Sequence, residues 1–285
     1  MPAPGHLPKE TEIHPTALVD PQASLGQGVF IGPWCVVGPH VRLGDHVRLH
    51  ASVMVEGHTV LEDGVEVYPF TTVGYPPQDL KYKNEPTRCH IGARTIVRES
   101  VTIHRGTAQG AGETYIGRDC LIMANAHIAH DCVLGDGVII VNNVVMGGHV
   151  TIGEQARIMG SAALHQFVRI GRGAVVGGLC GVEMDVIPYG SVLGNRARLV
   201  GLNWVGLKRA GVEAGEIQQM RLAFRELYPR AFGGETVLGE RVSVVRQKYG
   251  HIARVAEMLR FMESPTRRGL TRPGRGAAWE KDDEG

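Results

Sequence analysis

The chain has 285 residues, 43% hydrophobic but only 6% aromatic, so it is long enough to bury a sizeable core that must be mainly aliphatic. Its 30 Lys and Arg residues balance 29 Asp and Glu, which excludes a general electrostatic attraction to nucleic acid or to a membrane surface. It has no run of about eighteen apolar residues and no apolar stretch at residues 1–10, so the sequence predicts a cytoplasmic protein without a signal peptide or membrane span.

A six-residue repeat dominates the first two thirds of the chain. Counting by six from Ile13 meets only Ile, Leu or Val as far as Val73, and glycine often occupies the next position. The phase returns from Ile91 to Ile103, and after a shift of one residue it runs from Ile116 to Val182. Neither a helix nor an ordinary strand repeats every six residues. The pattern predicts short strands that close in threes around inward aliphatic side chains, giving a parallel β-helix of roughly eight or nine coils, about 40 Å long.

Two segments interrupt this repeat. Residues 75–90 are too polar to fill the interior of a β-helix, and residues 104–115 are rich in glycine. Both are expected to project as loops, and loops on a rigid scaffold commonly carry functional residues.

The repeat ends near Pro188, and after a bridging segment to Asn203 the hydrophobic period becomes helical. One stripe predicts a helix that ends at Pro229, and it consists of Ile217, Met220, Phe224 and Leu227. A second stripe predicts one more helix, and it consists of Val245, Ile252, Val255, Leu259 and Met262. The predicted organisation is a β-helix domain over residues 1–203, a helical domain over 204–263 and a disordered tail over 264–285.

The five cysteines are scattered and contain no Cys-x-x-Cys pair, which argues against a disulfide framework and a structural zinc site.

Four histidines lie close together in the second block of repeats, outside its inward positions: His127, His130, His149 and His165. Such histidines could bind zinc between subunits, as in carbonic anhydrases with a β-helix, although those use a His-x4-His pair. Alternatively one imidazole could act as a general base whose tautomer Asp131 fixes.

Longer strings make the chain similar to a known enzyme family. They are EPTR at 85–88, RESVTIHRGT at 98–107, NAHIAHDC at 125–132 and HQF at 165–167, with QDLKY at 78–82 and GLKR at 206–209. In these strings the chain resembles the bacterial UDP-N-acetylglucosamine 3-O-acyltransferases, hexapeptide-repeat enzymes that catalyse the first step of lipid A synthesis. The resemblance runs from near Ile13 into the helical region. It implies that the β-helix is left-handed, because general crossover rules alone would favour the other hand.

The resemblance implies catalytic roles for three residues. His130 would be the general base, Asp131 would orient it, and the backbone N–H of Gly148 would stabilise the oxyanion of the thioester. No metal and no other cofactor is implied.

It also implies how the substrates bind. Gln78 and Asp79 would contact the glucosamine, and Lys81 the nucleotide or the donor arm. The other residues expected to bind the sugar, the pyrophosphate or the nucleotide are His127, His149, His165, Gln166, Asn203 and Arg209. Val205 and Ala210 occupy positions where the family often has an acidic residue and a second arginine. The resemblance therefore implies no contact with the nucleotide at these two positions.

The partners implied by the resemblance are a 3-hydroxyacyl chain on acyl carrier protein, UDP-N-acetylglucosamine, and two further copies of the chain in a homotrimer. Basic residues of the helical region, including Arg225, Arg246 and Lys248, would dock the carrier protein, although a solvated basic face explains them equally. Gly178 would leave a groove open for an acyl chain of about fourteen carbons or more, and Arg196 is the other candidate for limiting its length.

Two other functions remain alternatives. One is a sugar-nucleotide N-acyltransferase acting on a 3-amino sugar, because the sequence does not decide whether the acceptor atom is oxygen or nitrogen. The other is a non-catalytic hexapeptide-repeat subunit used for assembly, for which the histidines and the QDLKY loop would have no purpose.

Overall fold

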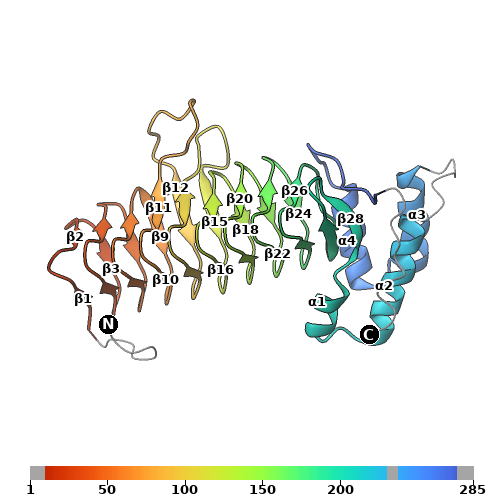
Figure 1. Cartoon of the computed structure of the whole chain (residues 1–285), viewed down its shortest axis with the longest axis horizontal. Helices are drawn as coiled ribbons and strands as arrows, with labels where there is room; N and C mark the ends of the chain where they lie inside the picture. Colours follow the sequence, from red (N-terminus) through yellow and green to blue (C-terminus); the bar gives the residue numbers. More distant parts are fainter. Residues whose placement is uncertain (1–9, 230–236, 275–285) are drawn as a thin grey trace.

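The computed structural model describes residues 10–229 and 237–274 of the chain. Within them the predicted left-handed parallel β-helix is confirmed, since short strands stack into three sheets along a prism and helices lie at its C-terminal end (Figure 1). None of the helices in these residues has the length and hydrophobicity that crossing a membrane requires.

The three sheets, here called A, B and C, alternate along the chain. Sheet A contains β1 (Glu12–Ile13), β4 (Phe30–Ile31), β7 (Arg48–Leu49), β10 (Glu66–Val67), β13 (Ile96–Val97), β16 (Leu121–Ile122), β19 (Ile139–Ile140), β22 (Arg157–Ile158), β25 (Val175–Val176), β27 (Gly190–Leu193) and β28 (Arg198–Leu202). Sheet B contains β2 (Leu18–Val19), β5 (Val36–Val37), β8 (Met54–Val55), β11 (Thr72–Tyr75), β14 (Thr102–His104), β17 (His127–Ile128), β20 (Val145–Met146), β23 (Ala163–Leu164) and β26 (Gly181–Val182). Sheet C contains β3 (Ser24–Leu25), β6 (Arg42–Leu43), β9 (His58–Leu61), β12 (Arg88–Ile91), β15 (Glu113–Ile116), β18 (Val133–Leu134), β21 (Thr151–Ile152) and β24 (Arg169–Ile170). Neighbouring strands pair in parallel, except for the antiparallel hairpin β27–β28.

The core is a column of inward aliphatic residues. In sheet A, Ile122 pairs with Ile140 and Ile140 with Ile158, and all three side chains are fully buried. Burying one such side chain contributes about 1.5–3 kcal/mol, so the repeat itself supplies the stability of the prism. Ile13 is 46% exposed because it lies in the first coil, which the described residues cover on one side only.

Glycine follows the inward residue because successive coils approach closely at the corners. A Cβ on Gly26 would lie 2.6 Å from the carbonyl carbon of Gly44, and a Cβ on Gly117 would lie 2.7 Å from that of Gly135. The left-handed backbone conformation falls at other corner positions, where residues such as Asn125 (φ 60°) adopt it. Asparagine tolerates that conformation better than most residues.

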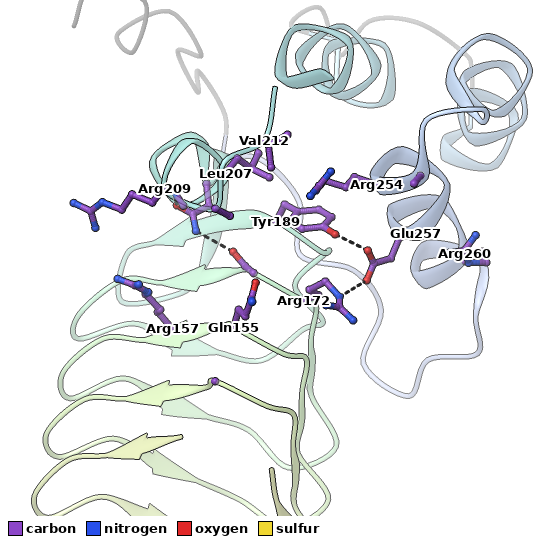
Figure 2. Close-up of a pocket in the computed structure, with 16 residues that line it drawn as sticks. Gln155, Arg157, Arg172, Tyr189, Leu207, Arg209, Val212, Arg254, Glu257 and Arg260 are labelled. Carbon is purple, nitrogen blue, oxygen red and sulfur yellow. Dashed lines mark hydrogen bonds and ion pairs between the residues drawn. The ribbon is translucent and has the colours of Figure 1, made fainter. Parts of the chain in front are cut away.

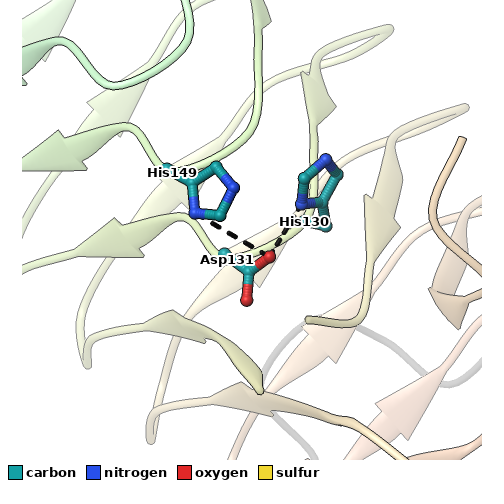
Figure 3. Close-up of side chains that lie close together, drawn as sticks. All are labelled: His130, Asp131 and His149. Atoms are coloured by element: carbon teal, nitrogen blue, oxygen red, sulfur yellow. Dashed lines mark hydrogen bonds and ion pairs between the residues drawn. The ribbon is translucent and has the colours of Figure 1, made fainter. Parts of the chain in front are cut away.

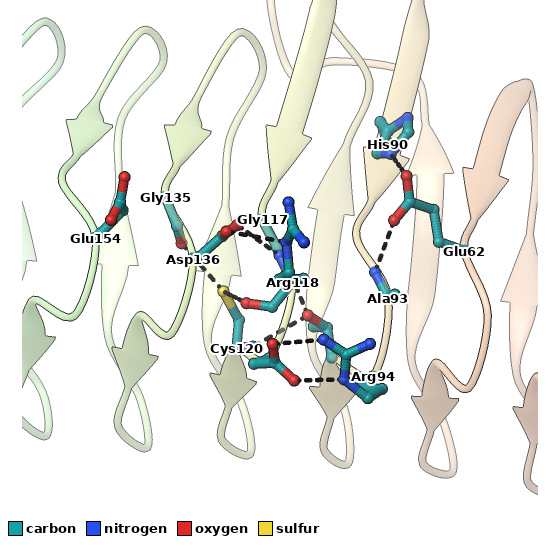
Figure 4. Close-up of polar contacts among 12 residues, drawn as sticks. Glu62, His90, Ala93, Arg94, Gly117, Arg118, Cys120, Gly135, Asp136 and Glu154 are labelled. Carbon is teal, nitrogen blue, oxygen red and sulfur yellow. Dashed lines mark hydrogen bonds and ion pairs between the residues drawn. The ribbon is translucent and has the colours of Figure 1, made fainter.

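Polar side chains also join neighbouring coils on the outside of the prism (Figure 4). Asp136 accepts a hydrogen bond from the Arg118 N–H at 3.0 Å, and its other oxygen lies 3.0 Å from Arg118 Nε. Glu62 accepts from the Ala93 N–H at 2.9 Å and lies 2.9 Å from His90 Nε2. Exposed ion pairs contribute only about 0–1 kcal/mol each to stability. These contacts therefore serve mainly to bond backbone N–H groups at the turns, and they add little to the stability of the fold.

The two loops predicted at residues 75–90 and 104–115 are present, but both are shorter than predicted because their ends belong to strands. Residues 76–87 connect β11 to β12 and residues 105–112 connect β14 to β15, and the two project from the same side of the prism (Figure 1). Each leads from sheet B to sheet C, so both leave from one edge, here called the B–C edge.

The helical region contains α1 (Trp204–Arg209), α2 (Ala214–Leu227), α3 (Leu238–Tyr249) and α4 (Ala253–Glu263). Helix α2 confirms the first predicted helix. The single second helix is wrong, because the stripe is divided where Ile252 adopts an extended conformation (φ −86°, ψ 118°) between α3 and α4. The six-residue helix α1 was not predicted, since one turn and a half has no hydrophobic period.

The predicted disorder of the tail is wrong for residues 264–274, here called the C-terminal strap. The Asp185 N–H donates to the Gly269 carbonyl at 2.8 Å, and the Thr271 N–H donates to the Asp185 carbonyl at 2.8 Å. The composition of the tail did not reveal this pairing, because the partner residue Asp185 lies more than eighty residues earlier in the chain. Residues 275–285 lie outside the described residues.

Two of the basic residues expected to dock a carrier protein have acidic partners. Arg246 contacts Glu263, and Lys248 Nζ lies 2.9 Å from Glu226 Oε2. These pairs link α3 to α4 and to α2, so part of the positive charge of this face is neutralised within the chain.

Candidate active site

The predicted catalytic residues gather at the B–C edge on two successive coils, and Gln166 follows on the next coil. Residues eighteen apart stack there, because His127 pairs with Val145 and Val145 with Ala163 in the strands that lead to this edge. The stacked sets are His130, Gly148 and Gln166, and beside them Asp131, His149 and Phe167. One edge of the prism therefore presents residues from three separate repeats side by side.

His130 and Asp131 form a hydrogen-bonded pair (Figure 3). His130 Nδ1 lies 2.7 Å from Asp131 Oδ2, and the exposed fraction of the side chain is 15% for the histidine and 0% for the aspartate. A carboxylate in that position holds the proton on Nδ1 and leaves Nε2 free to accept one. This is the arrangement that a histidine general base requires.

The loop of residues 105–112 holds the carboxylate of Asp131. Thr107 donates to Oδ2 from its hydroxyl at 2.7 Å, and the Gly112 N–H donates to Oδ1 at 3.1 Å. Burial raises the pKa of Asp131, but hydrogen bonds from His130 and Thr107 outweigh burial and bring the pKa below its ordinary value. A Cβ on Gly110 would lie 2.4 Å from the Asp131 carboxylate, so the glycine-rich sequence of the loop lets it close over an ionised side chain.

Gly148 packs directly on the ring of His130. A Cβ at this position would lie 2.5 Å from Cε1 and 2.7 Å from Nε2, so only glycine leaves the imidazole in place. Among the described residues no acceptor is bonded to the Gly148 N–H, so this donor is left without a partner beside the ring of His130. Such a donor can stabilise negative charge that develops on a substrate oxygen.

His149 supports this pair from the next coil. Its Nδ1 lies 3.9 Å from Asp131 Oδ2, its ring meets the edge of the His130 ring at 5.1 Å, and its other face stacks on Phe167 at 4.5 Å. Burial lowers the pKa of His149, so the ring is neutral at pH 7.

His127 and His104 form a second histidine pair beside the first. Their ring centroids are 4.9 Å apart, and His127 Nδ1 lies 2.7 Å from Thr102 Oγ1. Burial, followed by the neighbouring His127 and His130, lowers the pKa of His104 to about 4. His104 was not among the predicted site residues, although it lies within the string RESVTIHRGT and directly precedes the loop that holds Asp131.

His165 and Gln166 occupy the same edge one coil further on. His165 Nδ1 lies 2.5 Å from Arg268 Nη2, and the Gln166 carbonyl accepts from Arg268 Nε at 2.8 Å. Arg268 belongs to the C-terminal strap, where the composition predicts disorder, so Arg268 was not among the predicted site residues.

The loop of residues 76–87 carries the remaining residues expected at this edge. Asp79 Oδ1 accepts from the Lys81 N–H at 3.0 Å, and the charge of Asp79 acts on His149 by raising its pKa, against the larger effect of burial. Gln78 and Lys81 are exposed, and Leu80 between them is 98% exposed. Of these residues, Asp79 is therefore close enough to affect His149, while Leu80 is left uncovered.

Asn203 and Arg209 are not brought to this edge. They line a pocket of about 700 Å³ where the turns from sheet C to sheet A meet α1 and α4 (Figure 2). Asn203 donates from Nδ2 to the Gly173 carbonyl at 2.9 Å, and its Oδ1 accepts from the Gly206 N–H to cap α1. Within one chain, the residues expected to bind the nucleotide are therefore divided between two edges of the prism.

Of the two residues expected to limit the acyl chain, Gly178 lies at one edge of sheet B and Arg196 lies at the C-terminal end of that sheet. Gly178 is in the turn from sheet A to sheet B, and a Cβ there would meet only the Gly160 carbonyl at 3.3 Å. Arg196 is in the turn of the hairpin β27–β28, whose Asn195 carbonyl accepts from the Gly181 N–H at 3.2 Å. Both positions lie further along the prism than the histidines.

His130, Asp131 and His149 could also be considered as metal ligands, since one ligand atom from each lies within 4.8 Å of the others. However, Asp131 Oδ2 already accepts from Thr107 Oγ1 and His130 Nδ1, both at 2.7 Å. A metal ion would have to replace these hydrogen bonds, so the donor set suits proton transfer better than metal binding.

An imidazole hydrogen-bonded to a buried carboxylate and packed against a glycine N–H, at one edge of a hexapeptide-repeat β-helix, defines an acyltransferase. Two family models agree: that of the bacterial transferase hexapeptide repeat matches residues 22–57 and 113–148, and that of the UDP-N-acetylglucosamine O-acyltransferase second domain matches residues 185–271.

Curated relatives and solved structures identify the particular family. An acyl-[acyl-carrier-protein]–UDP-N-acetylglucosamine O-acyltransferase of Anaeromyxobacter sp. is 46% identical over 91% of this chain and 99% of the relative, and one of Rhizobium johnstonii is 41% identical over 95% and 98%. The UDP-N-acetylglucosamine acyltransferase of Campylobacter jejuni superposes with a TM-score of 0.86 at 32% identity, covering 92% of this chain and all of the other. The chain belongs to the UDP-N-acetylglucosamine O-acyltransferase family.

Proposed function

We propose that this protein transfers a 3-hydroxyacyl chain from acyl carrier protein to the 3-hydroxyl of UDP-N-acetylglucosamine, the first step of lipid A synthesis. The observation that carries the proposal is the 2.7 Å hydrogen bond between His130 Nδ1 and the buried Asp131, with the Gly148 N–H beside the ring. His130 Nε2 takes the proton of the sugar hydroxyl while its oxygen forms a bond to the thioester carbonyl. Gly148 stabilises the oxyanion, the carbon–sulfur bond then breaks, and His130 returns the proton to the departing thiolate.

The acceptor is held by the polar residues around this pair. We assign Gln78, Asp79 and His127 to the glucosamine, and His149, His165 and Gln166 to the sugar and pyrophosphate. Lys81 contacts the nucleotide or the donor arm. Asn203 and Arg209 bind the nucleotide, and the planar guanidinium of Arg209 suits phosphate oxygens.

The division of these residues between two edges supports a homotrimer. The B–C edge carries His130, whereas Asn203 and Arg209 lie at the edge between sheets C and A, so one chain cannot close both around a single nucleotide sugar. Packing three prisms side by side would place one edge of each against another edge of its neighbour. The exposed Leu80 of the loop of residues 76–87 would then gain a partner.

The acyl chain lies along the outer face of sheet B. From His127 the paired positions on successive strands are Val145, Ala163 and Gly181, which become smaller toward the hairpin that holds Arg196. Three strand spacings amount to about 14 Å, enough for a long acyl chain. We expect Gly178 to keep this groove open and Arg196 to stand at its end.

The donor is recognised through its acidic carrier protein, which we place on the basic side of the helical region that includes Arg225, Arg246 and Lys248. Because Arg246 and Lys248 already have acidic partners, their share of the attraction is small and the contact weakens as salt is added.

The five buried cysteines are all free, which supports the cytoplasmic location, where thiols stay reduced.

Mass spectrometry of the products formed from UDP-N-acetylglucosamine and a mixture of 3-hydroxyacyl carrier proteins tests the proposal. We expect one ester product, sensitive to mild base, and full activity in the presence of a chelator. Preference for a 3-amino sugar nucleotide with an alkali-stable amide product would establish the N-acyltransferase instead. Loss of activity with the chelator that zinc restores would support the metal alternative.

A further inference from the structure

The C-terminal strap of residues 264–274 crosses the corner that carries His165, Gln166 and Phe167. Arg268 contacts two consecutive residues of this corner: its Nη2 lies 2.5 Å from His165 Nδ1, and its Nε donates to the Gln166 carbonyl at 2.8 Å. The guanidinium of Arg267 lies 4.5 Å from the centre of the Phe167 ring. Residues one hundred positions apart in the sequence are thereby joined at one edge of the prism.

The contact with Arg268 determines the tautomer of His165. A guanidinium has only N–H donors and keeps its proton at any pH the protein meets, so His165 Nδ1 must be the acceptor. The Gln166 carbonyl, 3.3 Å from the same Nδ1, then receives its hydrogen bond from Arg268 and not from the histidine. The proton of a neutral His165 consequently resides on Nε2, which becomes a fixed donor for a ligand.

The strap does not depend on Arg268 for its own position. Asp185 is fully buried and accepts from Thr266 Oγ1 at 2.6 Å and from Arg169 Nε at 2.8 Å. Its backbone pairs with Gly269 and Thr271. Removal of the Arg268 side chain should therefore leave the strap in place and change only the corner.

The same corner also supports the catalytic pair. Phe167 stacks on His149 at 4.5 Å, and His149 Nδ1 lies 3.9 Å from Asp131 Oδ2. The strap thus borders the part of the proposed site that binds the nucleotide sugar. Arg268 contacts His165 and Gln166, which are assigned to the sugar and pyrophosphate, and Arg267 lies over the Phe167 ring on which His149 stacks.

We propose that Arg268 is a positioning residue for the nucleotide sugar: it fixes His165 as an Nε2–H donor and holds the Gln166 backbone, so that the corner is already arranged when the acceptor binds. This inference rests on the proposed function for the identity of the ligand. It adds to that function a residue of the strap that acts through His165 and not through the reacting atoms.

A double-mutant cycle tests the proposal with the full-length protein. The variants are Arg268→Met, His165→Ala and the double variant, with Arg272→Met as the matched control, because Arg272 lies in the same strap and makes no side-chain hydrogen bond or ion pair among the described residues. The dissociation constant of UDP-N-acetylglucosamine is measured by titration calorimetry without donor, and kcat and KM are measured separately.

We expect Arg268→Met to weaken binding about tenfold and to raise KM for the nucleotide sugar by the same factor, with kcat within about twofold of wild type. In the His165→Ala background the same change should alter binding less than about twofold, because the residue through which Arg268 acts is gone. Arg268→Lys, which keeps the charge but not the fork, should recover only part of the affinity.

The proposal is overturned if Arg268→Met weakens binding equally in both backgrounds, if Arg272→Met has the same effect, or if binding is unchanged in Arg268→Met and Arg268→Lys. A wild-type protein that binds the nucleotide sugar but transfers no acyl chain to it would contradict the proposed function alone, since the binding cycle is measured without donor.

Discussion

The β-helix and the helical region build their cores in different ways. In the β-helix each inward residue packs on its equivalents in the coils before and after it, as Ile140 does between Ile122 and Ile158. In the helical region α2 packs against both α3 and α4, and residues such as Phe224 and Leu227 fill a small cluster made by helices that are not equivalent. The first core is a repeated column, and the second is a single assembly.

This difference affects where chemistry can be placed. In the β-helix the column alone supplies the core, so outward residues at a corner, such as His130 and His149, can be chosen for catalysis. In the helical region the outward residues are also used to join helices, as the Arg246–Glu263 and Lys248–Glu226 contacts show. Stability and catalysis are therefore more nearly separate in the β-helix, and four predictions examine that separation.

The largest effect is expected from His130→Ala. Loss of a general base should lower kcat by about 10²–10⁴-fold, while the melting temperature stays close to that of wild type because the side chain is outside the column. His127→Ala is the matched control and should weaken acceptor binding or slow the reaction less. A His130→Ala enzyme that keeps more than about a tenth of the wild-type kcat would rule out the general-base role.

Ile140→Ala and Ile217→Ala compare the two cores directly. Ile140 is fully buried between equivalent residues that cannot close the gap, so its truncation should reduce the free energy of unfolding by about 4 kcal/mol. Ile217 in α2 is 7% exposed, and there the cost should be about 2 kcal/mol. Urea unfolding measures both, and equal losses would show that the column does not pack more rigidly than the helices.

His104 makes stability depend on pH. Its pKa is about 4 in the folded protein because of burial and about 6.5 in the unfolded chain, so the unfolded state binds the extra proton and stability falls as the pH drops from 6.5 toward 4. The loss from this residue should reach about 2–3 kcal/mol at pH 4.5. His104→Phe should remove that part of the loss in urea unfolding at pH 7 and pH 4.5, whereas an unchanged difference would assign the acid sensitivity to other groups.

The smallest effect is a change in specificity. Gly178→Met should reduce the preference for a 3-hydroxy chain of about fourteen carbons over one of about ten by at least fourfold, since each excluded methylene forgoes about 0.8 kcal/mol. Competition between the two acyl carrier proteins measures the ratio of products. Leu179→Met, at the exposed neighbouring position, is the control and should leave the ratio as it was, and an unchanged ratio in Gly178→Met would direct attention to Arg196.

The sequence predicted the β-helix well because each repeat contains the residues that determine its conformation: the inward residue, the glycine and the strand recur every six positions. The eighteen-residue coil also explains why His130, Asp131 and Gly148 lie together at one edge, while the catalytic roles that the resemblance implies for them stay predictions. The sequence did not predict the contact of Arg268, whose partner His165 is more than one hundred residues away. It also did not predict the break between α3 and α4, because the hydrophobic stripe continues through Ile252, where the backbone is extended. Contacts between distant segments leave no period in the sequence.

Because residues eighteen apart stack, the position of each residue around the prism depends on how many residues precede it in the repeat. Removing one complete coil from the N-terminal part would shorten the prism by about 4.8 Å and leave every later corner in its place, whereas removing a few residues within a coil would rotate all that follows. The chain tolerates other lengths at the B–C edge, where Leu61 pairs with Ile91 and Ile91 with Ile116 across intervals longer than eighteen. Evolution can therefore lengthen the prism by whole coils and vary its chemistry by insertion at that edge, as two independent choices.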